Sequence, residues 1–351
     1  MELIATPDNP VPPGALVTPV GASDGVVLRV ARWPNTGQTR GTVCVFTGRG
    51  EFIEKYFETI GELVARNFAV VAMDWRGQGL SGRPLAHAGK GHVDDFILYE
   101  RDLEALKQQV LEFLCPRPWF ALAHSMGGAI LLSQAQAGAS PFERVVVSAP
   151  MIDIHGLRFP RAIRAIIEVA DIVGLGSAFI PGGKSGSLMS GPFEDNVLTS
   201  DAGRFARNAA IVETAPQLAV GDPTIGWLNA AFRLMAGFLD PDRPRSALTP
   251  ILAFSAGSDR IVSTPAIHRY MAGLKTSLVV PLAGAQHEIL QERDAIREQF
   301  WAAFDAFVPG QRDESAALGT IIATRQAAAE ARAAQSWLRR LVPSRKRAAL
   351  R

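Results

Sequence analysis

Short apolar segments alternate with longer segments of helical periodicity along the first 150 residues of the chain. The apolar segments are nearly continuous in Val, Ile, Phe and Ala, as expected of strands buried on both faces of a sheet. We predict strands at residues 26–33, 42–46, 68–74, 119–123 and 144–148, and again at 251–255 and 277–281. Helical patterns lie between them at residues 56–66, 96–113 and 128–136. This alternation predicts an α/β fold with a mostly parallel central sheet.

The alternation stops after residue 150 and resumes at residue 251. Between these points there are only helical patterns broken by Gly and Pro, at residues 161–173, 202–214 and 224–237. Such a segment of about 100 residues is too long for a plain loop of a compact domain. We therefore predict an α/β core at residues 15–150 and 247–310, with a helical cap at residues 151–246 over one end of the sheet.

Composition and charge narrow the function classes. With 48% hydrophobic and 20% charged residues, the chain has the composition of a packed globular protein. The formal net charge is +2, but residues 311–351 hold nine basic and three acidic residues, which leaves −4 on residues 1–310. An acidic body argues against nucleic acid as a partner. Two cysteines, Cys44 and Cys115, provide neither a disulfide framework nor a zinc ligand set, which indicates a reducing compartment.

The basic tail at residues 311–351 is a third predicted region. Its Ala-rich part favours a helix, along which Arg325, Arg332 and Arg339 form a basic stripe. One hypothesis is peripheral contact with the inner membrane surface, and the other is an exposed extension, because alanines give a weak apolar face. The start of the chain lacks the features of a secretory signal, and no run of 18 apolar residues occurs. We therefore expect a cytoplasmic location.

The most informative segment is the end of the predicted strand at 119–123, where a helical pattern begins at once. The sequence Ala123-His-Ser-Met-Gly127 matches the nucleophile elbow G-x-S-x-G with Ala in the first position. The turn is so sharp that the positions two before and two after Ser125 must be small, and both are. The hydroxyl would then project above the sheet beside the positive end of a helix. We predict that Ser125 is a nucleophile.

A serine nucleophile needs a base, and the base needs a carboxylate that fixes its tautomer. After an elbow of this kind, the acid and then the histidine follow in chain order. Asp259 and His287 each come directly after a predicted strand, so both should emerge at the sheet edge where Ser125 lies. We predict them as the catalytic acid and base. His268 is expected on an exposed helix, and His124 is expected to point away from the serine in a packing role.

A developing oxyanion should find two backbone donors, one after the serine and one in the loop after an early strand. The Thr-Gly-Arg-Gly sequence at residues 47–50 leads out of such a strand, and its glycines allow close approach of the backbone. We predict the N–H groups of Arg49 and Met126 as the oxyanion hole. The alternative for this loop is an ordinary glycine turn.

Two glycine-rich motifs resemble nucleotide-binding or phosphate-binding sequences, but we predict that neither binds a cofactor. Residues 77–82 match G-x-G-x-x-G after a strand, but a loop follows instead of the helix that would hold a pyrophosphate. Residues 183–185 suggest a phosphate loop, but Ala178 stands where the first glycine belongs. We expect neither a cofactor nor a metal.

Several segments carry a resemblance to a known family. They are residues 47–56 (TGRGEFIEKY), 74–81 (DWRGQGLS), 123–128 (AHSMGG), 257–262 (GSDRIV) and 284–292 (GAQHEILQE), with NVLTS at 196–200 and GDPTIGW at 221–227 in the predicted cap. In this order they resemble the α/β-hydrolase-fold serine hydrolases of the monoacylglycerol lipase and bacterial lysophospholipase type (serine aminopeptidase S33-like). The resemblance spans about residues 15–308 and implies a helical cap inserted after the sixth strand.

Two positions depart from the family pattern. Thr47 stands where the family usually has His, so any role of that imidazole in shaping the oxyanion loop is lost. Arg49 places a cation at the mouth of the expected site, which would favour an anionic or phosphate-bearing substrate.

The resemblance implies a carboxylic ester hydrolase that acts on lysophospholipids or monoacylglycerols through a Ser-Asp-His triad and an acyl-enzyme. The triad does not specify the bond that is cleaved, so a peptidase or another α/β-hydrolase reaction is an alternative. A lipid-binding scaffold is a non-enzymatic alternative. Apolar residues of the predicted cap either line an acyl pocket or form the core of the cap: Phe179, Phe193, Phe205, Trp227, Phe232 and Met235. The oligomeric state is left open.

Overall fold

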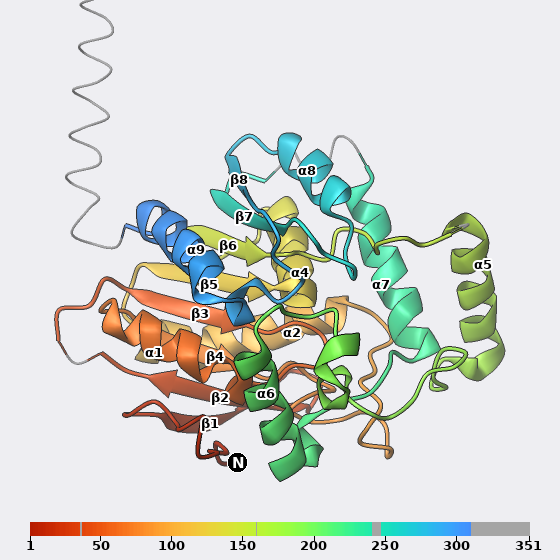
Figure 1. The fold of residues 1–351 in the computed structure, drawn as a ribbon, viewed down its shortest axis with the longest axis horizontal. Helices are drawn as coiled ribbons and strands as arrows, with labels where there is room; N and C mark the ends of the chain where they lie inside the picture. The colour runs from red at the N-terminus through yellow and green to blue at the C-terminus, as the bar shows by residue number, and fades with distance from the viewer. Residues whose placement is uncertain (36, 159, 241–246, 310–351) are drawn as a thin grey trace, which may run out of the picture. The chain divides into compact units, whose positions relative to one another are not determined.

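A single sheet of eight strands organises the protein in the computed structural model, which describes residues 1–35, 37–158, 160–240 and 247–309 (Figure 1). The strand order is β1–β2–β4–β3–β5–β6–β7–β8. β2 pairs antiparallel with β1 and β4, and every other pair in the sheet is parallel. The strands are β1 (Leu16–Gly21), β2 (Val27–Trp33), β3 (Thr42–Phe46), β4 (Ala69–Met73), β5 (Trp119–His124), β6 (Arg144–Ser148), β7 (Ile251–Ala256) and β8 (Ser277–Leu282).

The central strands agree with the predicted segments because their composition reflects burial on both faces. Every residue of β3, β4, β5 and β7 is buried. The edge strand β1 was not predicted, since its residues are mostly exposed or half-buried and Pro19 interrupts its pattern. A proline inside a strand is tolerated at a sheet edge, where one backbone N–H has no partner strand.

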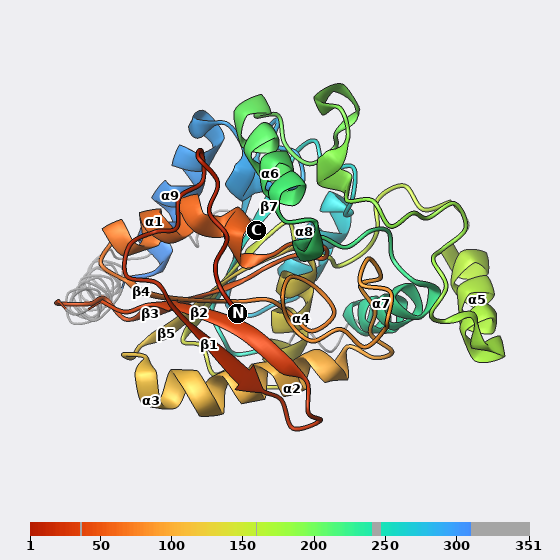
Figure 2. The ribbon, with the colours of Figure 1, turned by 90° about the horizontal axis from the view of Figure 1, so that it is seen from below.

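Helices cover both faces of the sheet. Figures 1 and 2 show α1 (Phe57–Ala65) and α9 (Asp294–Phe307) on one face, with α2 (Ile97–Leu106) and α4 (Ser125–Gln136) on the other. The predicted helix at 96–113 contains a π-helical turn at Lys107–Leu111 before α3 (Glu112–Leu114). The remaining core helices are α8 (Thr264–Ala272) and the single turns Ile53–Tyr56 and Ile289–Gln291.

The segment between β6 and β7, residues 151–246, is called the helical insert here. It contains α5 (Pro160–Ala170), α6 (Ala202–Thr214), α7 (Ile225–Phe238), a π-helical turn at Asp171–Leu175 and 3₁₀ turns at Leu188–Ser190, Phe193–Asp195 and Pro216–Leu218. α6 has the predicted bounds. The side chains of Asp201 and Thr224 cap α6 and α7 by accepting hydrogen bonds from the backbone N–H three residues on.

The insert is packed in two different ways. The apolar side chains of α7 join the main hydrophobic core, whereas α6 has a smaller cluster that also includes Phe52 of the core. Ion pairs fasten α6 as well, because Arg204 lies 2.6 Å from Glu58 and 2.7 Å from Asp294, and Arg207 lies 2.7 Å from Glu58. Helix α6 is therefore tied to α1 and to the start of α9.

Residues 1–308 form one compact unit. The predicted tail helix and its basic stripe lie outside the described residues. None of the helices in the described part of the chain is long and apolar enough to cross a membrane.

Candidate active site

Ser125, Asp259 and His287 converge at the carboxyl edge of the sheet. Ser125 begins α4 directly after β5, while Asp259 follows β7 and His287 follows β8. His287 Nε2 lies 3.0 Å from Ser125 Oγ, and His287 Nδ1 lies 2.9 Å from Asp259 Oδ2. All three residues are buried. The structure thus brings together the three side chains that the sequence singled out, in hydrogen-bonded order.

The strand–turn–helix around Ser125 is as tight as the elbow motif requires. Ser125 has a φ of 48°, a left-handed conformation that is uncommon for a residue with a side chain. A Cβ added at Gly127 would lie 2.6 Å from the carbonyl oxygen of Thr47, so only glycine fits there. The start of α4 therefore packs main chain to main chain against the end of β3.

Asp259 is held as a carboxylate. Burial of its carboxyl opposes ionisation, but the hydrogen bond and charge of His287 and the N–H groups of Val262 and Ile261 outweigh burial and lower the pKa of Asp259. Oδ1 accepts both backbone bonds, which leaves Oδ2 for His287. The carboxylate of Asp259 thus fixes the orientation of the His287 ring, with Nδ1 as the donor to Asp259 and Nε2 facing the hydroxyl of Ser125.

The two predicted oxyanion donors come from the helix that begins at Ser125 and from the loop after β3. Met126 is the second residue of α4, and the backbone N–H groups of the first turn of a helix have no acceptor within that helix. Arg49 lies in the loop after β3, and its backbone N–H has no acceptor among the described residues. Arg49, Ser125 and His287 all line one cavity.

Gln78 braces this loop from both sides of Arg49. Its Oε1 accepts a hydrogen bond from the N–H of Gly50 at 3.1 Å, and its Nε2 donates to the carbonyl oxygens of Gly48 at 2.7 Å and Glu51 at 3.0 Å. Gln78 belongs to the glycine motif at 77–82, which therefore supports the loop that carries Arg49. The sequence did not predict this role.

A buried polar cluster lies beside His287, and we call it the Lys55 cluster: Glu51, Lys55, Tyr56, His124 and Glu288. The Lys55 ammonium pairs with the carboxylates of both Glu51 and Glu288. Glu51 Oε2 accepts hydrogen bonds from Tyr56 Oη and from the N–H of Gly48. The cluster thus links the oxyanion loop to the residue that follows His287.

The two carboxyls of the Lys55 cluster differ in their pKa values. Burial disfavours the charge of Glu51, but Lys55 and the hydrogen bond from Tyr56 lower its pKa to about 2. Burial raises the pKa of Glu288, which Lys55 offsets only in part, and the charge of Glu51 raises it further. Burial also lowers the pKa of His124 to about 4, so this imidazole is neutral. Within this cluster, the single ammonium of Lys55 is therefore shared by two carboxyls of unequal acidity.

His124 differs from its predicted role as a packing residue. Its ring centroid lies 4.7 Å from that of His287, its Nδ1 lies 3.1 Å from the carbonyl oxygen of Ser148, and it lines the same cavity as Ser125. His268 lies on α8 and is exposed, as expected, with its Nε2 2.8 Å from Ser255 Oγ.

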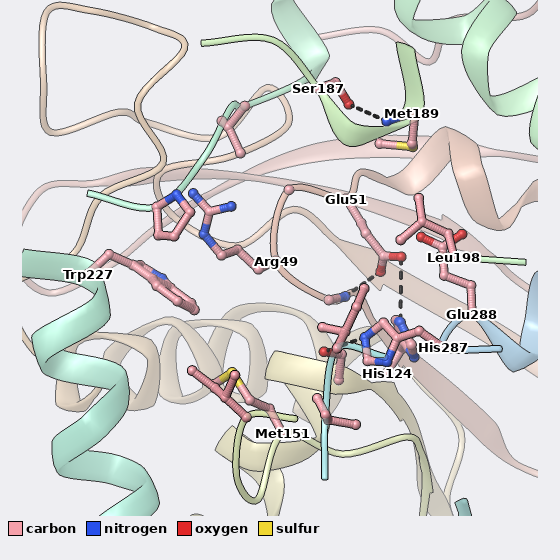
Figure 3. Close-up of a pocket in the computed structure, with 18 of the residues that line it drawn as sticks. Arg49, Glu51, His124, Met151, Ser187, Met189, Leu198, Trp227, His287 and Glu288 are labelled. Carbon is pink, nitrogen blue, oxygen red and sulfur yellow. Dashed lines mark hydrogen bonds and ion pairs between the residues drawn. The ribbon is translucent and has the colours of Figure 1, made fainter. Parts of the chain in front are cut away.

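The cavity beside Ser125 has a volume of about 240 Å³ and a mainly apolar wall (Figure 3). Its wall is shared between the loops of the core and the helical insert, which contributes Met151, Ile154, Ser187, Met189, Leu198, Val220, Gly221, Pro223, Trp227 and Leu228. Within the described part of the chain, no group of three or more His, Cys, Asp or Glu residues is placed to hold a metal ion.

The aromatic residues predicted for the acyl pocket lie elsewhere, with one exception. Trp227 lines the cavity, whereas Phe179, Phe193 and Phe232 do not. Phe179 packs against His87 and Phe193 packs against Phe205, while Phe232 joins the main core. These three rings therefore pack against other parts of the protein. The prediction was wrong for them because the spacing of aromatic residues along the sequence does not distinguish a pocket wall from a helical core.

The sheet order and the loops that carry the serine, the acid and the histidine define the α/β-hydrolase fold, which confirms the predicted fold class. The monoglyceride lipase of Saccharomyces cerevisiae, solved as a soluble variant in complex with a substrate analog, shares it with a TM-score of 0.66 and 18% identity, over 84% of this chain and 95% of that one. A thermostable carboxyl esterase from Bacillus coagulans shares it with a TM-score of 0.67 and 18% identity, over 84% and 99% of the two chains.

The chain belongs to the family described as Serine aminopeptidase, S33, which matches residues 37–294. Lysophospholipase L2 of Escherichia coli strain K12 is 33% identical over 78% of this chain and 82% of its own. A monoacylglycerol lipase of Mycolicibacterium smegmatis is 24% identical over 68% of this chain and 77% of its own. The family resemblance indicated by the sequence motifs is thereby confirmed.

Proposed function

We propose that this protein hydrolyses carboxylic esters of lipid-like substrates, lysophospholipids or monoacylglycerols, through an acyl-enzyme on Ser125. The observation that carries the proposal is the continuous hydrogen-bonded series from Ser125 through His287 to Asp259, at 3.0 and 2.9 Å, beside an apolar cavity. Relatives named for these two substrate classes support the choice of bond.

The arrangement performs acyl transfer in two halves. Ser125 Oγ attacks the ester carbonyl carbon while His287 Nε2 takes its proton, and the tetrahedral oxyanion is bound by the N–H groups of Arg49 and Met126. His287 then passes the proton to the departing alcohol, which leaves the acyl group on Ser125. Water attacks this ester with His287 again as the base, and the acid leaves. Asp259 stabilises the charged imidazole in both halves.

Replacement of the nucleophile tests the proposal. Ser125→Ala removes the attacking oxygen, so turnover of a p-nitrophenyl ester and covalent labelling by a fluorophosphonate should both be lost. Ser133→Ala, on the same helix but outside the cavity lining, is the matched control and should keep both. Full activity or labelling in purified Ser125→Ala would overturn the assignment of Ser125.

The helical insert is part of the same proposal and acts as the cap of the site. It supplies ten of the residues that line the cavity, while the core supplies the reacting groups. A cap of this kind excludes water from the acyl chain and selects substrates by shape. Substitution of Leu228 by Trp, which would narrow the cavity, should lower kcat/KM more for a long acyl chain than for an acetyl ester.

The alternative of an aminopeptidase, which the family description names, can be separated by substrate. An enzyme that selects a free α-ammonium group would need an unpaired carboxylate at the cavity, but Glu51 and Glu288 are both engaged by Lys55. We therefore expect hydrolysis of monoacylglycerols and none of aminoacyl-naphthylamides. The opposite pattern would favour the peptidase.

A further inference from the structure

The guanidinium of Arg49 is a cation in the cavity wall, and none of the described carboxylates forms an ion pair with it. Its Nη2 donates to the carbonyl oxygen of Gly221 at 2.9 Å, and its Cζ lies 4.9 Å from the ring centroid of Trp227. Its Nε is buried and has no hydrogen-bond partner within residues 1–35, 37–158, 160–240 and 247–309. In the part of the chain that the structure describes, no carboxylate lies within ion-pair distance of it. The charge therefore faces the cavity only partly satisfied.

The buried cations elsewhere in the described residues are treated differently. Arg29, Lys55, Arg76 and Arg297 are each in contact with one or two carboxylates. This is the usual arrangement, because an uncompensated charge removed from water costs several kcal/mol. Arg49 is half-buried and has no such carboxylate among the described residues. The half-buried Arg83 also donates only to carbonyl oxygens, but it lies outside the cavity lining, whereas Arg49 is part of it.

The surroundings of Arg49 leave it ready for an anion from the cavity. Burial lowers its pKa to about 10, which the more distant Tyr99 and Asp222 only partly offset. Asp222 itself accepts a hydrogen bond from the N–H of Lys184. A guanidinium has five N–H donors in one plane, and the only hydrogen bond of the Arg49 guanidinium to the described residues is the one from Nη2 to Gly221. An oxyanion with two or more oxygens matches the edge of this plane best.

The backbone and side chain of Arg49 point to different parts of the cavity. Its backbone belongs to the oxyanion loop beside Ser125, while Figure 3 shows its side chain directed toward Trp227 and away from His287 and Glu288. A group bound by the guanidinium would thus be separated from the scissile carbonyl by the length of one arginine side chain. A glycerol backbone with a phosphate at its far end has a comparable reach.

We propose that Arg49 forms an anion subsite that binds the phosphate of a lysophospholipid headgroup, so that the enzyme prefers phosphate-bearing acylglycerols to neutral ones. The inference rests on the proposed ester hydrolysis. It concerns the alcohol side of the ester, since the phosphate is carried by the glycerol that leaves. The oxyanion donors are main-chain groups, so the subsite adds selectivity without changing the chemistry of the triad.

The test compares two substrates within each variant. Hexanoyl glycerol and hexanoyl glycerophosphoglycerol carry the same acyl chain and are used below their critical micelle concentrations, so that surface effects are absent. The ratio of kcat/KM, phosphate-bearing over neutral, should fall at least about tenfold in Arg49→Met, the cost of one charge-assisted hydrogen bond. Arg49→Lys, which keeps the charge but not the planar fork, should give an intermediate ratio.

The control variant is Arg101→Met, which removes a partly exposed cation outside the cavity lining and should keep the wild-type ratio. An unchanged ratio in Arg49→Met would overturn the subsite, whatever the absolute rates. If wild type hydrolyses neither substrate, the proposed function fails instead. Ratios cancel any loss of activity common to both substrates.

A second readout identifies the source of the anion. Glycerol 3-phosphate should inhibit hydrolysis of hexanoyl glycerol competitively in wild type, and Arg49→Met should lose this inhibition. Glycerol should not inhibit at the same concentration. If inorganic phosphate inhibits through Arg49 as well as glycerol 3-phosphate does and the substrate ratio is unchanged, the site binds free phosphate and the headgroup assignment is overturned.

Discussion

The two sides of the cavity differ in whether a positively charged side chain is paired with carboxylates. On the side of His287, the Lys55 cluster pairs its ammonium with two carboxylates and buries them together. On the side of Trp227, Arg49 has a carbonyl oxygen and an aromatic ring in place of a carboxylate. A paired charge serves the structure of the protein, and an unpaired charge remains available to a ligand. The difference separates residues that hold the site from a residue that selects what enters it.

The largest expected effect concerns the catalytic pair on the His287 side. Asp259→Asn keeps the shape but removes the charge that orients His287, so kcat for a p-nitrophenyl ester should fall by about 10⁴-fold. Steady-state kinetics would check it, with Asp95→Asn, an exposed carboxylate, as control. A fall of less than tenfold would mean that Asp259 does not act through His287.

The next prediction sets the two cations against each other. Lys55→Met leaves Glu51 and Glu288 buried without their partner and should lower the free energy of unfolding by about 3–5 kcal/mol. Arg49→Met removes a charge that no carboxylate of the described residues pairs with, and should change the free energy of unfolding by less than about 1 kcal/mol in either direction. Urea unfolding followed by circular dichroism measures both. Equal losses would remove the distinction between the two sides.

The brace on the oxyanion loop gives a smaller effect on turnover. Gln78→Ala removes three hydrogen bonds around Arg49, so kcat should fall by roughly 10- to 100-fold through misplacement of the donor. The substrate ratio that reports the Arg49 subsite should change less than kcat. A change confined to KM would argue against a positioning role for Gln78.

The smallest effect on stability is expected from Glu58, a carboxylate that is also ion-paired but less buried than those of the Lys55 cluster. Burial opposes its ionisation, but the hydrogen bond with Arg204 and the charges of Arg297 and Arg207 lower its pKa to about 2. Because the folded pKa lies below the ordinary 4.5, this stabilisation is complete above that pH and is lost as pH falls toward 2.

Glu58→Gln should therefore be less stable than wild type at pH 6, and the difference should shrink between pH 4.5 and 2. Unfolding midpoints in urea across this range would measure it. A difference that is independent of pH would show that Glu58 contributes by packing and not by charge.

The sheet and the residues Ser125, Asp259 and His287 could be predicted from the sequence for physical reasons. Strands buried on both faces leave long apolar runs, so β3 and β6 were predicted with their observed bounds. Ser125, Asp259 and His287 each follow such a strand, and the parallel sheet brings their loops to one edge. Where a local pattern fixes the backbone, the position of the side chain follows.

The rest depends on contacts between distant segments. Lys55 is paired with a carboxylate 233 residues away, and no local pattern announces that pair. The role of Gln78 was not predicted, because Gln78 lies in a glycine motif whose usual interpretation is nucleotide binding. For the phenylalanines of the insert, helical periodicity shows that they are buried but not whether they face the core or the cavity, and Trp227 alone of the four site candidates lines it.

Gly127 and the carbonyl oxygens of Phe46 and Thr47 leave no space for a side chain between them. Main-chain contact thus holds the start of α4, with the proposed donor Met126, and the side chain of Gln78 holds the loop of the proposed donor Arg49, so neither position depends on the side chain of residue 49. Selection can exchange that side chain for another as headgroups change, while the machinery for breaking the ester is inherited intact. In such a protein, the range of substrates can change during evolution without a change in the residues that cleave the ester.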